Sequence, residues 1–265
     1  MRFLTASATD AGIKRKENQD SFLAVTAQTR LGPAAFLLLC DGMGGLSRGE
    51  LASAEAVRSF ADWFARRFPL LCRESFSPER LWKEWGGLIA GLNGRIANYG
   101  RQHHVSLGTT ATGLLFVGEQ GYGLHVGDSR AYALSAKDAR RLTRDQTLVQ
   151  RELERGNLSP QQAETDGRRH VLLQCIGASP VVEPEFFLVP RRREDVYLLC
   201  SDGLIHQLAD RELCAALWPQ RSHGAEEMGR AARQLVELAK ERGETDNITA
   251  VLLWEADTDS EEGQP

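Results

Sequence analysis

The sequence predicts an α+β layered sandwich, in which antiparallel β-sheets are flanked by helices. Strand-like apolar runs come first, helical patterns follow in a pair, and strand-like runs then return. This order differs from the steady strand–helix alternation of a parallel α/β fold. With 265 residues, of which 42% are hydrophobic, the chain can bury one sizeable core. We therefore expect a single domain over residues 1–255.

The first half of the chain contains three predicted strands and two predicted helices. Apolar runs bounded by Gly, Pro and polar clusters indicate strands at residues 3–8, 22–27 and 34–40. Ser47, with Glu50 three residues later, has the pattern of a helix N-cap, and apolar residues then recur at helical spacing up to about residue 68. Pro78 favours the start of a second helix, which fades near Tyr99.

The second half returns to strands, which we expect at residues 109–117, 122–126, 131–134, 196–200 and 248–254. Residues 146–190 begin with a helical pattern and are then broken repeatedly by Gly and Pro, so we interpret them as a flap over a sheet edge. Helices are expected at 208–217 and 225–242. Residues 256–265 have the composition of a disordered acidic tail.

Composition excludes several classes of function. The net charge is −4 and no Lys/Arg stripe is present, so nucleic-acid binding is not expected. The longest apolar run has seven residues, 34–40, whereas a membrane-spanning helix needs about 20. Five cysteines without a CxxC pair are typical of buried thiols in a reducing cytoplasm, and neither disulfides nor a zinc site are expected. The six histidines lack metal-ligand spacing such as HExxH.

Aspartates recur at the ends of the predicted strands. Three apolar runs are followed by Asp and a small residue, and two strands are preceded by Asp; the five positions are Asp41, Asp128, Asp202, Asp20 and Asp246. If residues 22–27 pair with 34–40 as an antiparallel hairpin, Asp20 and Asp41 become neighbours at one sheet edge. The same holds for Asp202 and Asp246 if their strands pair.

Four carboxylates at one edge repel one another and persist as anions only with cations among them. An oxygen-only ligand set, without Cys or His, suits Mg²⁺ or Mn²⁺. Gly42 allows close backbone approach, so its carbonyl is a further candidate ligand. Arg15 could hold a phosphate beside a metal pair, which would point to phosphoester hydrolysis. The alternatives remain open, since Asp-Gly after a strand is often only a turn and residues 14–16 could be a solvated basic run.

Seven segments, taken in order, resemble the metal-dependent serine/threonine phosphatases of the protein phosphatase 2C (PPM) family in its compact bacterial form. They are RKENQD at 15–20, DGMGG at 41–45, GTTATG at 108–113, HVGDSRAY at 125–132, RLTRDQ at 141–146, CSDGL at 200–204 and DNITAV at 246–251. The resemblance implies a four-layer α-β-β-α sandwich of two antiparallel sheets flanked by helix pairs. It also implies a cytoplasmic enzyme that removes phosphate from phosphoserine and phosphothreonine.

The resemblance further implies a role for each matching residue. Asp41 would bridge two Mn²⁺ or Mg²⁺ ions, and a water shared by these ions would attack phosphorus directly. Arg15 would bind the substrate phosphate. Thr109, Thr110 and Asn247 would form hydrogen bonds around the ligands rather than react. The implied metal-binding residues are Asp20, Asp41, Gly42, Asp202 and Asp246, with Asp128 helping to hold a weaker third ion.

Two positions and one segment depart from the family pattern, the segment being LQCIG at 173–177 in place of a TRALG-like run. Met43 stands where some members carry a histidine that can act as a general acid, so the leaving group would need another proton source. Gln146 stands where we expect histidine, which affects the conformation of the flap more than the metal centre.

The resemblance implies a phosphorylated protein of a cognate bacterial serine/threonine kinase as the partner, and we expect a monomer. A catalytically weak pseudophosphatase with the same fold is the main alternative, although all five aspartates are kept. A phosphatase of the sporulation-regulator type would differ in substrate only, and a two-metal nuclease would need a basic surface.

Overall fold

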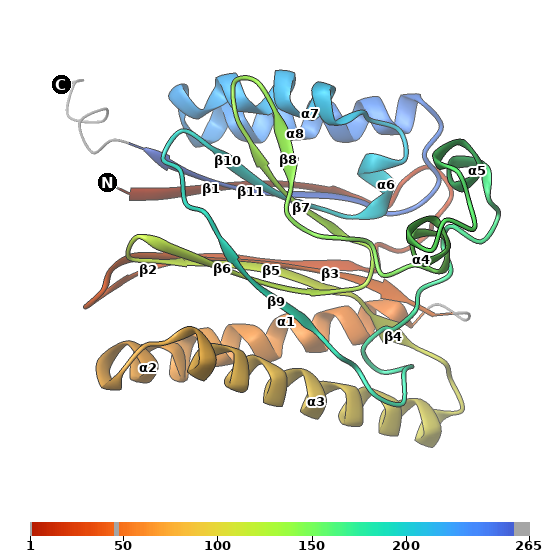
Figure 1. Ribbon diagram of the computed structural model, residues 1–265, viewed down its shortest axis with the longest axis horizontal. Coiled ribbons are helices and arrows are strands. Elements are labelled where there is room, and N and C mark those ends of the chain that lie inside the picture. Colours follow the sequence, from red (N-terminus) through yellow and green to blue (C-terminus); the bar gives the residue numbers. More distant parts are fainter. Residues whose placement is uncertain (1, 45–47, 257–265) are drawn as a thin grey trace.

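Two antiparallel β-sheets stack face to face in the computed structural model, which describes residues 2–44 and 48–256 (Figure 1). The five-stranded sheet consists, in spatial order, of β1 (Arg2–Asp10), β11 (Ile248–Ala256), β10 (Val196–Cys200), β7 (Arg130–Leu134) and β8 (Ala139–Arg141). The second sheet consists of β2 (Asp20–Thr29), β3 (Gly32–Met43), β5 (Ala111–Val117), β6 (Gln120–Val126) and β9 (Glu185–Val189), with β4 (Gly108–Thr109) beside β3.

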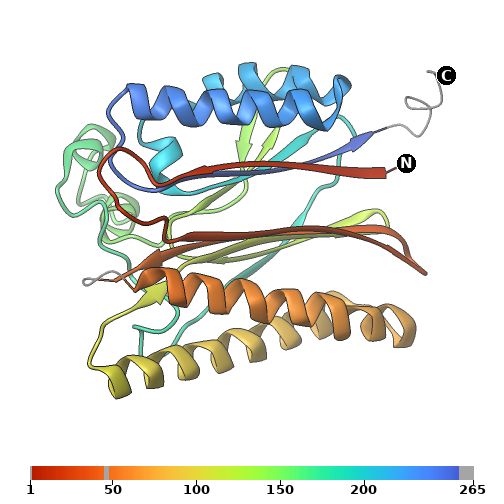
Figure 2. The same cartoon turned by 180° about the vertical axis from the view of Figure 1, so that it is seen from behind.

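Helices cover the outer face of each sheet, which gives the predicted four-layer α-β-β-α arrangement (Figures 1 and 2). The second sheet is covered by α1 (Gly49–Arg66), α2 (Phe68–Glu74) and α3 (Pro78–His103), and the five-stranded sheet by α7 (Asp210–Leu217) and α8 (Gly224–Glu241). Three short helices, α4 (Leu148–Glu154), α5 (Pro160–Thr165) and α6 (Asp202–Ile205), gather near one end of the sandwich. A 3₁₀ turn, Trp218–Ser222, precedes α8.

Strand β3 shows why its sequence is a continuous apolar run. Because side chains of a strand alternate between its two faces, Phe36 and Leu38 pack against the helices, whereas Leu37 and Leu39 pack against the other sheet. All four side chains are fully buried. On the helix side, the ring of Phe36 lies 5.9 Å from that of Trp85 in α3. A strand with both faces in a core needs apolar residues at every position, which is why β3 is a continuous apolar run instead of an alternating one.

The predicted strands and the long helices are confirmed, with differences at their ends. The first helix ends at Arg66 and α2 begins separately, with Pro69 in its first turn. Helix α3 continues through Gly86 and Gly87 to His103, because a stripe that includes Trp85 and Ile89 is buried along its length. The expected strand 109–117 is divided into β4 and β5 at Thr110, whose backbone and side chain both bond Asp41.

The region predicted as a flap, residues 146–190, contains more regular structure than its sequence suggested. It includes α4 and α5, and its last part is β9, which pairs with β6 as an edge strand of the second sheet. Ser47, the expected N-cap, and residues 257–265 of the expected tail lie outside the described residues. No helix in the described part of the chain is long and apolar enough to cross a membrane.

Candidate metal centre

The strand pairing brings the predicted aspartates to one edge of the sandwich. Asp20 and Asp41 are direct partners in the antiparallel register of β2 and β3, as predicted. Strands β10 and β11 also pair, so Asp202, which follows β10, and Asp246, which precedes β11, meet at the same edge. Together with Asp128, these carboxylates lie close enough for each of the other four to raise the pKa of Asp41.

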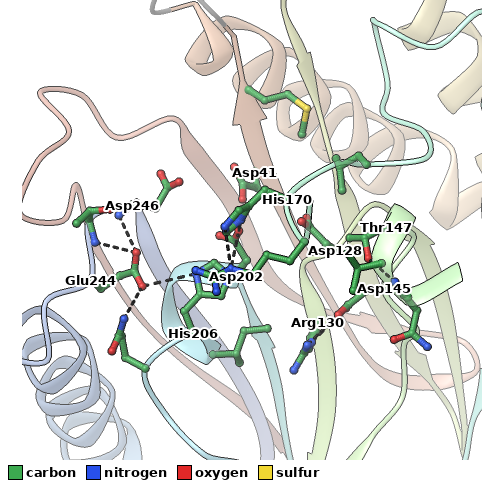
Figure 3. A pocket seen from close by; sticks show the side chains of 18 of the residues that line it. Asp41, Asp128, Arg130, Asp145, Thr147, His170, Asp202, His206, Glu244 and Asp246 are labelled. Carbon is green, nitrogen blue, oxygen red and sulfur yellow. Dashed lines mark hydrogen bonds and ion pairs between the residues drawn. The ribbon is translucent and has the colours of Figure 1, made fainter. Parts of the chain in front are cut away.

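A cleft of about 1270 Å³ opens above this edge (Figure 3). Asp41, Asp128, Asp202 and Asp246 line it, and Arg15 lies at its rim. The flap forms the opposite wall. Asp20 does not line the cleft, because its side chain is buried beneath the other carboxylates.

Burial and mutual repulsion disfavour the ionised forms of the carboxylates at this edge. Burial raises the pKa of Asp20 to about 7, and the negative charges of Asp202 and Asp246 also raise it. The hydrogen bond from Thr249 acts in the opposite direction and lowers this pKa. Burial and the neighbouring carboxylates raise the pKa of Asp41 well above its ordinary value, and that of Asp128 to about 8. Oδ1 of Asp20 is buried without a hydrogen-bond partner. An unpartnered buried oxygen among like charges fits a divalent cation.

Two threonines hold the backbone of Asp41. The hydroxyl of Thr110 lies 2.9 Å from the backbone N–H of Asp41, which donates to it, and the N–H of Thr110 donates to the carbonyl of Asp41 at 2.9 Å. The hydroxyl of Thr109 donates to the same carbonyl at 3.0 Å. Both threonines are fully buried. They therefore position the Asp41 side chain without lining the cleft.

Asn247 fixes the loop that carries Arg15. Its Oδ1 accepts from the N–H of Gln19 at 2.9 Å, and its Nδ2 donates to the carbonyls of Ala11 and Glu17 at 3.0 and 3.1 Å. In the middle of this loop, Nη2 of Arg15 donates to Oδ2 of Asp246 at 2.8 Å. The guanidinium is half exposed, with 52% of the side chain accessible, so it can also reach a ligand in the cleft.

Glycine is required at positions 42 and 203 by close packing. A Cβ atom on Gly42 would lie 2.3 Å from the carbonyl oxygen of Gly49 at the start of α1. A Cβ atom on Gly203 would lie 2.3 Å from the carbonyl oxygen of Asn247. Each glycine thus follows an aspartate of the site and lets a second element approach it, so the Asp-Gly pairs are more than surface turns.

Gln146 supports the loop that presents Asp128. Its Oε1 accepts from the N–H of Gly127 at 2.9 Å, and its own N–H donates to the Gly127 carbonyl at 2.8 Å. Gln174 of the flap donates to the same Oε1 at 2.9 Å. Gln146, which stands where histidine was expected, therefore links the Asp128 loop to the flap.

Two histidines of the site were missed by the sequence analysis. Nε2 of His206 lies 3.6 Å from Oδ2 of Asp202, and Nδ1 of His170, from the flap, lies 3.8 Å from the same oxygen. The sequence analysis did not anticipate either histidine beside Asp202. His206 follows Asp202 by four residues, a spacing that one helical turn could have indicated. No local signal in the sequence connects His170 to this site.

Asp145 was also missed, although it lines the cleft. It receives a bidentate ion pair from Arg130, with contacts of 3.1 and 2.8 Å, and a further ion pair from Arg141. These two arginines neutralise Asp145 within the protein. It is consequently less suited to a metal ion than Asp128 on the neighbouring loop.

Comparisons with known proteins agree with this geometry. A family model described as protein phosphatase 2C matches residues 12–239. Serine/threonine protein phosphatase PstP of Mycobacterium tuberculosis is 31% identical over 261 residues, which cover 98% of this chain and 46% of PstP, so the chain spans about half the length of that relative. Serine/threonine phosphatase stp of Listeria welshimeri is 32% identical over 247 residues, covering 92% of this chain and 93% of stp.

The fold similarity extends to a solved structure that contains metal. A crystal structure of the catalytic domain of PstP in complex with two manganese ions superposes with a TM-score of 0.76 at 30% identity, covering 96% of this chain and 99% of that one. These relatives are named as phosphatases, and none of these names points to a pseudophosphatase.

Proposed function

Since this chain belongs to the protein phosphatase 2C family, we propose that it removes phosphate from phosphoserine and phosphothreonine residues of proteins, with divalent metal ions as cofactors. The observation that carries this proposal is the meeting of Asp20, Asp41, Asp202 and Asp246, two from each of the stacked sheets, at one edge of the sandwich beneath a cleft. The volume of the cleft, about 1270 Å³, leaves room for a phosphorylated side chain.

We propose that these four aspartates and the Gly42 carbonyl hold two Mn²⁺ or Mg²⁺ ions, and that Asp128 helps to hold a weaker third. The donors are hard oxygens, which such ions prefer. Oδ1 of Asp20 is buried without a hydrogen-bond partner, so it is available as a metal ligand. The structure of the PstP catalytic domain with two manganese ions supports a count of two main ions. When bound, the ions would supply a strong nucleophile from water near neutral pH and polarise the phosphoryl oxygens.

The residues of the chain itself would bind and orient the substrate. Arg15 presents a planar guanidinium that can hold a phosphate through two hydrogen bonds. Its ion pair with Asp246 limits its side-chain freedom, and the contacts of Asn247 hold the backbone beneath it. Arg15 would thus be oriented before the substrate arrives, which lowers the entropy cost of reaching the reactive geometry. Asp41, fixed by two threonines, would act as the central carboxylate.

The flap would contribute to the choice of substrate. Residues 146–190 form the wall of the cleft opposite the aspartates, and they bring His170, Leu172 and the helices α4 and α5 to it. We propose a phosphoprotein of a cognate serine/threonine kinase as the substrate, a monomer as the working unit, and a cytoplasmic location. All five cysteines are free thiols, which suits a reducing compartment.

A side-by-side assay tests this proposal. Phosphopeptide, para-nitrophenyl phosphate and DNA are each incubated with the full chain in Mn²⁺ and in EDTA. We expect Mn²⁺-dependent release of phosphate from the phosphopeptide and no cleavage of DNA. Phosphate release that persists in EDTA, or a folded protein that binds Mn²⁺ without hydrolysing phosphopeptide, would contradict the proposal.

A further inference from the structure

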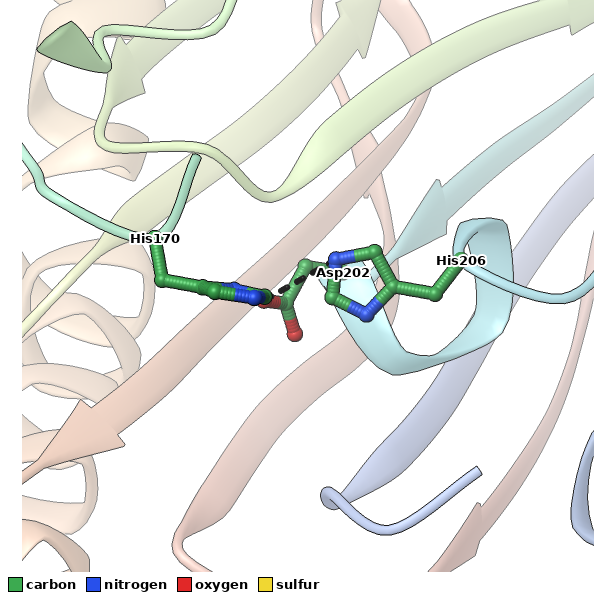
Figure 4. Close-up of side chains that lie close together, drawn as sticks. All are labelled: His170, Asp202 and His206. Carbon is green, nitrogen blue, oxygen red and sulfur yellow. Dashed lines mark ion pairs between the residues drawn. The ribbon is translucent and has the colours of Figure 1, made fainter. Parts of the chain in front are cut away.

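We propose that His170, Asp202 and His206 form a nitrogen-containing transition-metal site that joins the flap to the core. Each of these side chains offers one donor atom, and the three atoms all lie within 4.8 Å of one another. The two imidazoles approach the Asp202 carboxylate from opposite sides (Figure 4). The inference rests on the proposed function only in that Asp202 would serve both this site and the neighbouring oxygen site.

The separations fit a metal ion that would draw the ligands inward slightly. Ligands bound tetrahedrally at about 2.0–2.1 Å lie about 3.4 Å apart. The carboxylate oxygen of Asp202 lies 3.6 Å from Nε2 of His206 and 3.8 Å from Nδ1 of His170. Shifts of a few tenths of an ångström complete the geometry on the Asp202 side. The two imidazole nitrogens must also approach each other, and most of this movement would come from His170, which lies on an exposed part of the flap.

Glu244 orients His206 in the manner of a metal ligand. Its Oε2 lies 3.6 Å from Nδ1 of His206, on the opposite side of the ring from Asp202. Glu244 is itself held by the backbone N–H groups of Thr245 and Asp246, at 2.8 and 2.9 Å. A carboxylate behind an imidazole fixes the ring and directs the other nitrogen toward the metal. His206 is thereby set to bind through Nε2.

The donor set distinguishes this site from the four-aspartate pair. Imidazole nitrogens favour ions such as Co²⁺ and Zn²⁺, and Mn²⁺ accepts them more readily than Mg²⁺, which binds oxygen ligands and retains its water. The two sites would therefore respond differently to metal supply. Mg²⁺ could fill the oxygen site alone, whereas a transition metal would also bind at the histidines and tie the flap to α6.

Binding at His170 would release an arginine. Nε of Arg169 donates to Nε2 of His170 at 3.0 Å, a contact that fits a neutral imidazole with its proton on Nδ1. A metal at Nδ1 moves that proton to Nε2, which can no longer accept from Arg169. The exposed Arg169 side chain, which lines the cleft, would then turn away and become available to an anionic substrate.

Electron spin echo envelope modulation of the Mn²⁺-loaded full chain tests the site, because it detects ¹⁴N nuclei bound to manganese. We expect ¹⁴N modulation in the parent protein and its loss in the double variant H170Q/H206Q. The control is H103Q, which removes an exposed histidine on α3 and should leave the modulation unchanged. Absence of ¹⁴N modulation in the parent, or its persistence in the double variant, would overturn the proposal.

Calorimetric titration with Co²⁺ gives a second measurement. Loss of even an outer partner of a metal ligand lowers affinity about 10- to 100-fold, so H170Q alone should weaken Co²⁺ binding at one site at least about tenfold. His170 is exposed, and this variant should keep the melting temperature of the parent in EDTA. Equal Co²⁺ affinity in H170Q and the parent would overturn the site. Phosphopeptide hydrolysis in Mg²⁺ alone is measured in parallel, and its absence from the parent would count against the proposed function instead.

Discussion

The hydroxyl of Thr249 donates a 2.6 Å hydrogen bond to Oδ2 of Asp20, and this bond joins β11 of one sheet to β2 of the other. It satisfies one oxygen of a buried carboxylate and leaves Oδ1 without a partner. The contact between the sheets therefore also orients a side chain of the proposed metal centre. Stability and metal binding should be coupled at this point.

Replacing Thr249 tests that coupling. T249V keeps the volume but removes the donor, so a buried acceptor loses its partner, which costs about 1–3 kcal/mol of unfolding free energy. T249S keeps the hydroxyl and loses only a methyl group, which costs about 0.8 kcal/mol. Urea unfolding in EDTA should rank the parent first, T249S second and T249V last. A T249V protein at least as stable as T249S would show that the hydrogen bond contributes little.

Asp41→Asn should separate stability from activity. We expect D41N to lose turnover on phosphopeptide, because the central carboxylate is gone. In EDTA we expect the same variant to unfold at higher urea than the parent, since like charges and burial raise the pKa of Asp41 and disfavour its ionised form. One pKa unit corresponds to about 1.4 kcal/mol, and a gain of at least about 1 kcal/mol is expected. Activity within tenfold of the parent, or lower stability in EDTA, would contradict this assignment.

The stability of the metal-free protein should fall as pH rises from about 6.5 to 8.5. The pKa values of Asp20 and Asp128 are raised to about 7 and about 8, so the folded state holds protons that the unfolded state has already released. The stabilisation that these two carboxyl groups contribute is fully present below their pKa in the unfolded chain. It is lost as pH rises through their pKa in the folded protein.

Unfolding free energies measured in EDTA across this window check the sign. The window lies above the range in which His125 titrates, whose pKa burial lowers to about 4. With saturating Mn²⁺ the trend should reverse, because the cation binds the ionised carboxylates. A flat profile in EDTA would indicate that these carboxylates are not desolvated together.

Arg15 should contribute to substrate binding through its planar fork. A charge-assisted hydrogen bond contributes about 1.5–3 kcal/mol, so R15A should lower kcat/KM for phosphopeptide about 10- to 100-fold. R15K keeps the charge without the fork and should recover only part of this loss. The matched control is K14A, one residue earlier in the same exposed loop, which should match the parent. If K14A lowered kcat/KM as much as R15A does, Arg15 would act only through its contribution to the surface charge.

The sequence was sufficient to predict much of the fold and the proximity of the aspartates. The side chains of β3 alternate between two cores, so the strand is a continuous apolar run in the sequence, and Asp41 could be recognised directly after that run. The hairpin register then placed Asp20 opposite Asp41 by geometry alone. Local pattern and antiparallel pairing therefore carry the information for this half of the site.

The remaining parts depend on contacts between segments that are distant in sequence. His170 lies near Asp202 in a flap that Gln146 and Gln174 help to anchor beside the Asp128 loop. Strand β9 does contain four consecutive apolar residues, 186–189, but they lie at the end of a segment broken by Gly and Pro, and nothing local in the sequence indicated that this run pairs with β6. Such long-range contacts leave no periodic trace in the sequence.

Anomalous scattering from crystals of the full chain grown with Mn²⁺ would locate the ions directly. We expect two manganese peaks within bonding distance of Asp41, with Asp20, Asp202 and Asp246 completing their surroundings. Peaks only at lattice contacts, or an aspartate cluster that stays free of manganese at saturating concentration, would contradict the proposed metal centre.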